Sequence, residues 1–183
     1  MSSGTVIFSH SSARAVCNHA RNVPDDVLRL TAANGSVVMV CFLPGYVTDA
    51  ERAQFEAAIA ERSRLQTIYG EHSEPMEAAM AEWRRAQPPY HGARLSDVAD
   101  HIDHIRKVAG IDHIGIGSDF DGFHGSVEGL EDVSKYPALL AELLRRGYSK
   151  QDLKKIAGLN ILRVMRLVEK IAARQQASKS LRP

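Results

Sequence analysis

The chain has 183 residues, a formal net charge of +1 and 44% hydrophobic residues. This length suffices for one domain with a substantial core, or for part of a larger domain. Because positive and negative charges are interspersed, the sequence lacks the concentrated basic face that nucleic-acid binding requires.

The sequence also lacks the signals of membrane proteins and exported proteins. No apolar run approaches the roughly 20 residues that span a bilayer, and the opening MSSG has neither the charged nor the apolar region of a signal peptide. Cys17 and Cys41 are too few for a disulfide framework and fit no zinc–cysteine spacing. We therefore expect a cytoplasmic protein that binds neither membranes nor nucleic acids.

Three apolar segments are typical of strands in a buried parallel sheet. They are Thr5 to Ser9, Ser36 to Phe42 and His113 to Ser118. Between the first two, a proline followed by two aspartates predicts the start of a helix and Gly35 predicts its end. A second helix is predicted from Leu95 to Val108, where apolar residues recur at helical spacing. Strands that alternate with helices indicate right-handed βαβ units.

The rest of the chain is predicted to be helical. Residues 48–89 are rich in Ala, Glu and Arg and are interrupted around YGEHSEP, which predicts an insertion of two helices outside the sheet. We expect this insertion to cover the mouth of a site or an edge of the sheet. Three helical stretches follow near the C-terminus: Ser134 to Arg146, Ser149 to Ala157 and Asn160 to Ala173. Residues 174–183 are polar and mildly basic, which predicts a frayed tail.

Polar side chains follow the first and third predicted strands. His10 ends the first strand, and Asp119 follows the third. Taken singly, His10 is more typical of a hydrogen-bonded loop or core histidine, and Asp119 is as typical of a turn or a helix cap as of a site. Parallel α/β folds, however, build their active sites at the carboxyl ends of strands. Because imidazole suits Zn²⁺ and a carboxylate can bind metal, orient water or hold an ammonium group, the pair indicates an active site.

Six segments occur in order along the chain: FSHSSAR, RNVPDDVLR, VVMV, ADHIDHIRKVAG, GIGSDFDG and GLEDVSKYPALLAELLRRGYS. Together they resemble the C-terminal half of the renal or membrane dipeptidases, the M19 zinc peptidases. The resemblance covers nearly the whole chain apart from the variable residues 48–89. It implies the C-terminal portion of a TIM (β/α)8 barrel of the metal-dependent hydrolase type, with three parallel strands and flanking helices. It also implies hydrolysis of dipeptides at a binuclear zinc site.

The resemblance implies roles for four residues. His10 matches a histidine that ligates one zinc ion, and Asp119 matches an aspartate that handles protons and engages the free amine of the substrate. Arg21 matches an arginine that clamps the substrate carboxylate, a task suited to a planar bidentate donor. Tyr46, after FLPG, matches a tyrosine of the substrate pocket. From the residues alone, Arg21 is more typical of a solvated loop arginine, and Tyr46 is as typical of a packing residue.

Two departures from the family pattern concern the site. Cys41 stands where the family commonly has asparagine, and Leu43 stands where it has tyrosine, so the pocket lining is expected to differ. The early His-x-Asp pair, the bridging glutamate and a second late-strand histidine have no counterpart here. The sequence therefore predicts either a truncated zinc dipeptidase or an inactive remnant. In both cases the expected partners are a missing N-terminal half or another copy of the chain.

Other histidines and cysteines have simpler interpretations. The HID stretch at residues 101–103 does not replace the missing His-x-Asp pair, because helical residues i and i+2 point about 200° apart. His101 and His104 share a helical face, which we expect to be a solvated surface beside Asp100 and Asp103. Cys17 is expected to be a small buried residue.

Overall fold

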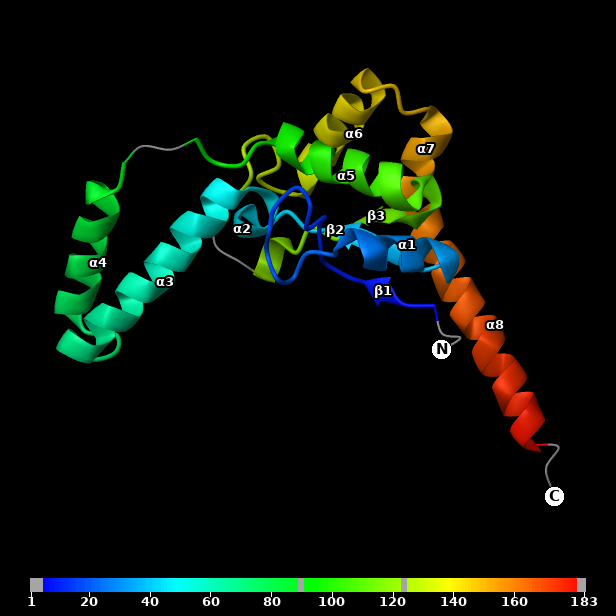
Figure 1. Cartoon of the computed structure of the whole chain (residues 1–183), viewed down its shortest axis with the longest axis horizontal. Helices are drawn as coiled ribbons and strands as arrows, with labels where there is room; N and C mark the ends of the chain where they lie inside the picture. Colours follow the sequence, from blue (N-terminus) through cyan, green and yellow to red (C-terminus); the bar gives the residue numbers. More distant parts are fainter. Residues whose placement is uncertain (1–4, 89–90, 123–124, 181–183) are drawn as a thin grey trace.

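A three-stranded parallel sheet lies at the centre of the computed structural model, which describes residues 5–88, 91–122 and 125–180. The strands β1 (Ile7–Phe8), β2 (Val37–Val40) and β3 (Ile114–Ile116) are hydrogen-bonded in the order β1-β2-β3 (Figure 1). Ile7 pairs with Val37, and Val38 pairs with Ile114. Each strand lies inside the apolar run that predicts it and is shorter than that run.

The segments that follow the strands stay close together at one edge of the sheet. The backbone N–H of Ser11 donates to Met39 O (3.0 Å), and that of Gly117 donates to Val40 O (3.0 Å). The N–H of Phe42 donates to Ser118 O (3.1 Å). Because all three strands run in the same direction, this edge collects their carboxyl ends, where a site is expected.

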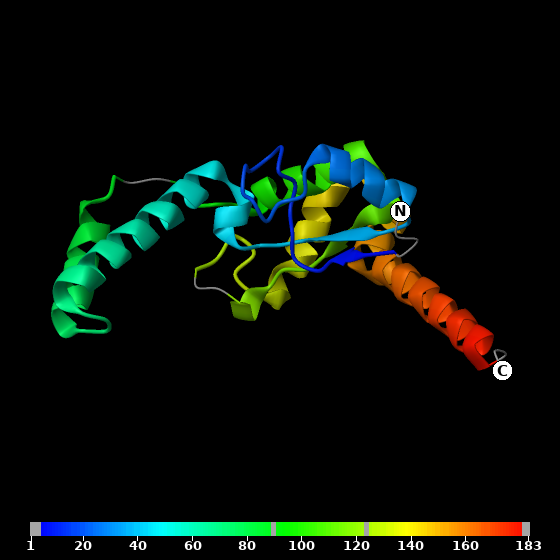
Figure 2. The same cartoon turned by 60° about the horizontal axis from the view of Figure 1, so that its bottom comes forward.

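Two connecting helices cover one side of the sheet (Figure 2). They are α1 (Asp25–Ala33) and α5 (Leu95–Ala109), at the positions that the sequence predicts. Two aspartates in the first turn of α1 complement the positive end of the helix dipole. The main core joins strand and helix side chains, among them Leu28, Val38, Val40, Ile102, Ile105 and Ile114.

The C-terminal part is a series of helical segments. They comprise the short turns η1 (Ile111–His113), η2 (Phe120–Gly122) and η3 (Val133–Lys135), then α6 (Tyr136–Arg145), α7 (Lys150–Lys154), η4 (Lys155–Leu159) and α8 (Asn160–Ser180). The Asn160 side chain anchors the start of α8 by donating to Ile111 O and Ile114 O, both at 2.8 Å. The helix continues to Ser180 and so includes residues 174–180, the first part of the segment for which the sequence predicts a polar tail. This stretch holds good helix formers and no glycine or proline.

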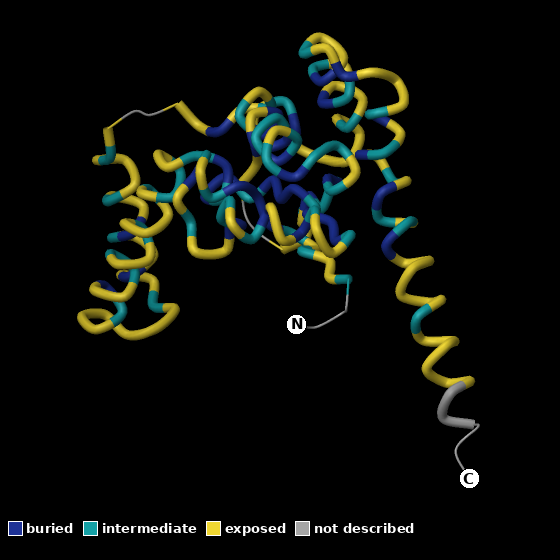
Figure 3. Tube along the Cα trace, turned by 45° about the vertical axis from the view of Figure 1, so that its right-hand side comes forward, coloured by how far each residue is buried: buried dark blue, intermediate teal, exposed yellow. Residues whose placement is uncertain are grey.

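Residues 44–86 form a helical arm. The short helix α2 (Pro44–Val47) leads into α3 (Asp49–Tyr69), and α4 (Glu74–Ala86) packs back along α3. The two long helices occupy the segment for which the sequence predicts two helices, and Pro89 lies outside the described residues. Figures 1 and 3 show this arm projecting from the sheet on the side opposite α8, with most of its surface exposed. A small core of Leu65, Met76 and Met80 holds the arm together.

His101 corrects the expectation of a solvated histidine face on α5, because its side chain is fully buried. Its Nδ1 accepts the N–H of Ala13 (3.0 Å), and its Nε2 donates to Val47 O (2.9 Å). His101 lies three residues after Val98 and four before Ile105, on the apolar stripe of the helix. Burial lowers its pKa below 6.5 and keeps the ring neutral. His104 is partly exposed and donates to Asp25 Oδ1 (2.7 Å).

Within the described residues, none of the helices is both long enough and apolar enough to cross a bilayer.

The close approach of the strand ends yields a first prediction, for Gly117→Ala. A Cβ at Gly117 would overlap the Ser9 carbonyl oxygen and lie 2.6 Å from Met39 Cβ, so backbone must shift. We expect Gly117→Ala to lower the free energy of unfolding by about 3 kcal/mol in urea denaturation. Gly115→Ala is the matched control, because its Cβ would meet the flexible end of the Met39 side chain, and we expect about 1 kcal/mol. Equal losses would contradict this packing.

A second prediction concerns His101. Replacing it with leucine leaves the Ala13 N–H and the Val47 carbonyl buried without hydrogen-bond partners. We therefore expect a loss of about 2–4 kcal/mol in the free energy of unfolding near neutral pH. His104→Leu, one turn along the same helix and partly exposed, should cost less than half of that.

The pH dependence of unfolding tests the same residue. The folded state holds His101 with a pKa below the usual 6.5, so the unfolded chain binds the additional proton. Stability should therefore fall as the pH drops below 6.5. The stability difference between the wild type and His101→Leu should shrink between about pH 8 and about pH 5. A constant difference would contradict a buried neutral imidazole.

Candidate functional site

The loop that follows β1, residues 9–23, folds over the strand ends and is tied down by buried polar side chains. Asn22 Oδ1 accepts the N–H of Ser12 (2.9 Å), while Asn22 Nδ2 donates to Cys17 O (2.9 Å) and to Tyr46 O (2.8 Å). His101 ties Ala13 of the same loop to the last residue of α2, as described above. Asn22 and His101 therefore fix the position of the loop relative to α2.

His10 and Arg21 lie at the two ends of this loop and contact each other. Arg21 Nη2 lies 2.7 Å from His10 Nε2, and His10 Nδ1 lies 2.8 Å from Ser9 Oγ. A guanidinium group can only donate hydrogen bonds, so Nε2 is the acceptor and Nδ1 carries the ring proton. The lone pair of His10 Nε2 thus faces the site, where Arg21 occupies it.

Tyr46 and His19 extend this group of side chains. The Arg21 guanidinium carbon lies 6.0 Å from the centre of the Tyr46 ring, and the His19 ring packs on Tyr46 with centroids 4.2 Å apart. His19 Nδ1 accepts the N–H of Arg21 (3.1 Å), and burial lowers the pKa of His19. The predicted residues His10, Arg21 and Tyr46 are therefore brought together. Sequence reasoning missed His19, because its spacing resembles no known coordination or catalytic pattern.

Asp119 lies at the same edge of the sheet, after β3. Its backbone is in the left-handed region (φ 65°), an uncommon conformation that aspartate tolerates better than most residues. The Asp119 carbonyl accepts the N–H of Gly122 (2.9 Å). Its carboxylate packs over the same glycine, because a Cβ at Gly122 would lie only 2.5 Å from Asp119 Oδ1. A side chain at position 122 would thus displace the carboxylate.

A cavity of about 710 Å³ lies between these segments. Its walls come from the β1 loop, the region around α2, the start of α3 and the loop after β3. The lining residues are His19, Leu43, Pro44, Gly45, Tyr46, Glu51, Phe55, Gly122, Gly125 and Ser126. Of the predicted site residues, Tyr46 lines this cavity, whereas His10, Arg21 and Asp119 are not among its lining residues. Arg21 lies beside Tyr46, and the Asp119 carboxylate lies against Gly122, another lining residue.

The cysteines of this region are inert by their surroundings. Burial, with a smaller contribution from the nearby Asp119, raises the pKa of the Cys41 thiol to about 11, although the Leu43 N–H and the Arg21 charge act to lower it. Cys41 Sγ accepts the N–H of Leu43 (3.4 Å). Cys17 is fully buried, as predicted, and burial raises its pKa to about 12. Both thiols are therefore protonated at neutral pH and are poor metal ligands or nucleophiles.

The fit of a zinc ion can be judged from the donor atoms. His10 presents a suitable nitrogen lone pair, but the Arg21 cation lies against it. Across the described ranges 5–88, 91–122 and 125–180, no group of three or more His, Cys, Asp or Glu side chains is placed to hold a metal ion. A catalytic zinc usually takes three protein ligands and a water. The described residues therefore do not fit a complete zinc site.

Comparison with known proteins gives consistent matches to dipeptidases. The chain is 38% identical over 171 residues to the dipeptidase tcpJ of Claviceps purpurea (strain 20.1), covering 93% of this chain and 31% of that protein. It is 38% identical over 180 residues to the dipeptidase ataJ of Aspergillus terreus, covering 98% of this chain and 35% of that protein. The chain thus spans about one third of the length of these curated relatives.

Solved structures match in fold. A crystal structure described as the probable dipeptidase PvdM from Pseudomonas aeruginosa has a TM-score of 0.68 and 30% identity, over 89% of this chain and 44% of that one. A metallopeptidase from Rhodobacter sphaeroides, liganded with a phosphinate mimic of the dipeptide L-Ala-D-Ala, has a TM-score of 0.62 and 24% identity, over 89% of this chain and 36% of that one. The second likeness supports the fold alone.

The model of the membrane dipeptidase family matches residues 1–179, almost the whole chain. The parallel α/β fold and the dipeptidase relatives agree with this match. We conclude that the chain belongs to the membrane dipeptidases, peptidase family M19.

Proposed function

We propose that this chain supplies the dipeptide-binding part of a family M19 active site. The observation that carries this proposal is that two opposite charges neighbour two residues that line one cavity, Tyr46 and Gly122. Arg21 lies beside Tyr46 of one wall, and the Asp119 carboxylate lies against Gly122 of another. A dipeptide carries a carboxylate at one end and an ammonium group at the other, so this arrangement complements both ends.

Each residue then has a specific role. The Arg21 guanidinium has five N–H donors and is well shaped for a bidentate contact to the substrate carboxylate. Tyr46 packs beside the guanidinium and limits the directions in which it can move. The Asp119 carboxylate accepts a hydrogen bond from the ammonium group of the substrate and can take a proton from it. The unusual backbone conformation at Asp119 directs the carboxylate over Gly122, beside the cavity.

Zinc is part of the proposal through His10. Zinc bound in a complete site would supply Lewis-acid chemistry, and His10 Nε2 is the nitrogen of this chain that would ligate one of two ions. Because the described residues do not complete that site, we assign to this chain the binding of the dipeptide, and cleavage to a protein that contains the remaining ligands.

The alternative proposal is an associating chain without catalytic activity of its own. The observation that favours it is the outer edge of β1, which lies at the end of the described sheet. Val6 and Ile7 there are 48% and 41% exposed. An exposed apolar edge strand is a ready site for pairing with another chain. The proposed partner is the N-terminal part of a related barrel or a second copy of this chain.

A third prediction tests the completeness of the metal site. The purified chain alone should not retain two zinc ions and should not release amino acids from dipeptides, because one histidine cannot hold a binuclear centre. Mixing it with the N-terminal part of a related dipeptidase should restore both properties. Metal content by mass spectrometry and amino-acid release provide the measurements.

Two variants make this test specific to His10. In the mixture, His10→Ala should abolish activity and lower the zinc content, whereas His91→Ala, an exposed histidine outside the site, should leave both unchanged. Two tightly bound zinc ions and steady turnover by the chain alone would refute the assignment of cleavage to a more complete protein.

A fourth prediction concerns the carboxylate clamp. We expect Arg21→Ala to weaken dipeptide binding about 10- to 100-fold in calorimetry, because a charge-assisted bidentate contact is lost. Arg29→Ala, an exposed arginine on α1, is the matched control and should bind normally. A dipeptide with an amidated C-terminus should bind wild type and Arg21→Ala equally weakly. If amidation weakens dipeptide binding to the same extent in wild type and in Arg21→Ala, the clamp lies elsewhere.

A further inference from the structure

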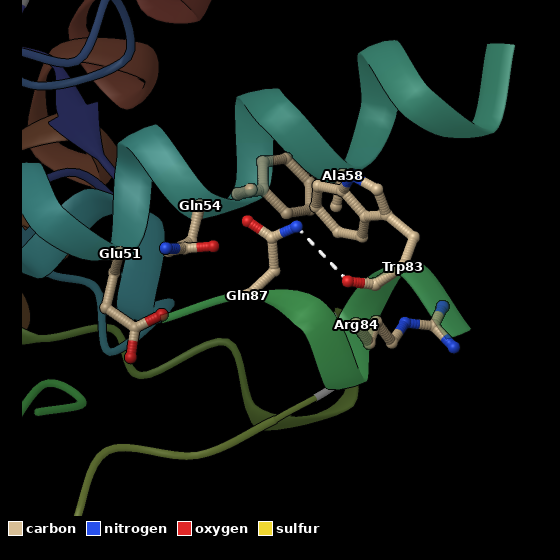
Figure 4. Close-up of a pocket in the computed structure, with 7 residues that line it drawn as sticks. Glu51, Gln54, Ala58, Trp83, Arg84 and Gln87 are labelled. Carbon is tan, nitrogen blue, oxygen red and sulfur yellow. Dashed lines mark hydrogen bonds between the residues drawn. The ribbon is translucent and has the colours of Figure 1, made fainter. Parts of the chain in front are cut away.

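Phe55 belongs to the helical arm but lines the cavity at the strand ends. It lies in the second turn of α3 and is 53% exposed. Besides the 710 Å³ cavity, it lines a separate groove of about 300 Å³ between α3 and α4. Figure 4 shows this groove, where Trp83 of α4 lies beside Ala58 of α3. Phe55, like Glu51, therefore lines both the cavity at the candidate site and the groove between the two helices of the arm.

The start of α3 is firmly attached to the site. Asp49 Oδ1 accepts the N–H of Asn18 in the β1 loop (3.0 Å). The helix also packs closely on α2, since a Cβ at Gly45 would lie 3.8 Å from both Phe55 Cβ and Arg52 Cα. The position of Phe55 relative to Tyr46 is thus set by backbone packing rather than by a flexible connection.

The surroundings of Phe55 are suited to an apolar side chain. Leu43, Pro44 and Tyr46 line the same cavity, and burial keeps His19 uncharged by lowering its pKa. Glu51 also lines the cavity, but its Oε1 accepts the N–H of Ala93 (3.1 Å). An apolar group entering the cavity would therefore meet mainly uncharged rings and aliphatic surface.

We propose that Phe55 is a specificity-determining residue that contacts a side chain of the bound dipeptide and favours dipeptides with a large apolar side chain. This inference rests on the proposed dipeptide binding and deepens it. An exposed phenyl ring becomes covered when such a side chain binds, and burial of apolar area by both partners stabilises the complex. A diglycine substrate has no side chain to make this contact.

The test measures binding of four dipeptides to the full chain: Gly-Gly, Leu-Gly, Gly-Leu and Leu-Leu. Trp83 is the single tryptophan of the sequence and shares a groove with Phe55, so its fluorescence can follow the titration alongside calorimetry. We expect at least one leucine-containing peptide to bind about tenfold more tightly than Gly-Gly, and Phe55→Ala to remove that advantage. Phe55→Leu should retain most of it.

Ile59→Ala is the matched control. Ile59 lies one turn further along α3 and is similarly exposed (51%), but it lines neither the 710 Å³ cavity nor the groove between α3 and α4. Its replacement should leave all four affinities unchanged. Equal binding of the four peptides by wild type, or equal weakening of all four by Phe55→Ala, would overturn the inference while leaving dipeptide binding in place. No binding of any peptide would instead refute the proposed function and this inference with it.

Discussion

The candidate site depends on the burial of a polar loop over the carboxyl edge of the sheet. Backbone N–H and C=O groups that leave water must find partners, and each one left unpaired costs about 1–3 kcal/mol. Asn22 and His101 satisfy five such groups, in the β1 loop and in α2. Without these two side chains, the loop could not lie where it brings Arg21 to Tyr46. Two buried polar residues thus convert a flexible connection into part of a site.

The strand ends place charged groups without burying them deeply. Arg21 and Asp119 are exposed, so neither incurs the large desolvation cost of a buried charge. The contact between Arg21 and His10 is well suited to exchange, because a guanidinium that donates to a neutral imidazole can transfer its donors to a stronger acceptor such as a carboxylate. The nearby cavity, lined by Tyr46 and Gly122, has the dimensions of a small-molecule site.

The helical arm contributes to the same site although its core is its own. Leu65, Met76 and Met80 hold its long helices together, whereas the start of α3 is attached to the β1 loop through Asp49. An arm with an independent core can vary in length and composition without disturbing the sheet. The residues near its base nevertheless line the cavity, so variation there would alter the shape and polarity of the cavity wall.

Local patterns in the sequence determined the type of most elements, because apolar periodicity, prolines and glycines act over a few residues. They identified three strands, α1, α5 and the two helices of the arm, and they placed His10 and Asp119 after strands, at the edge of the sheet where both lie. The family motifs added Arg21 and Tyr46.

Tertiary structure alone decided the rest. His101 has the spacing of a surface pair with His104, yet it is buried because its partners at Ala13 and Val47 come from distant segments. Likewise Phe55 looks like any exposed residue of a long helix, and it joins the cavity only because α3 packs on Gly45. Such contacts join residues far apart in the chain, and no local pattern encodes which distant backbone group will meet a given side chain.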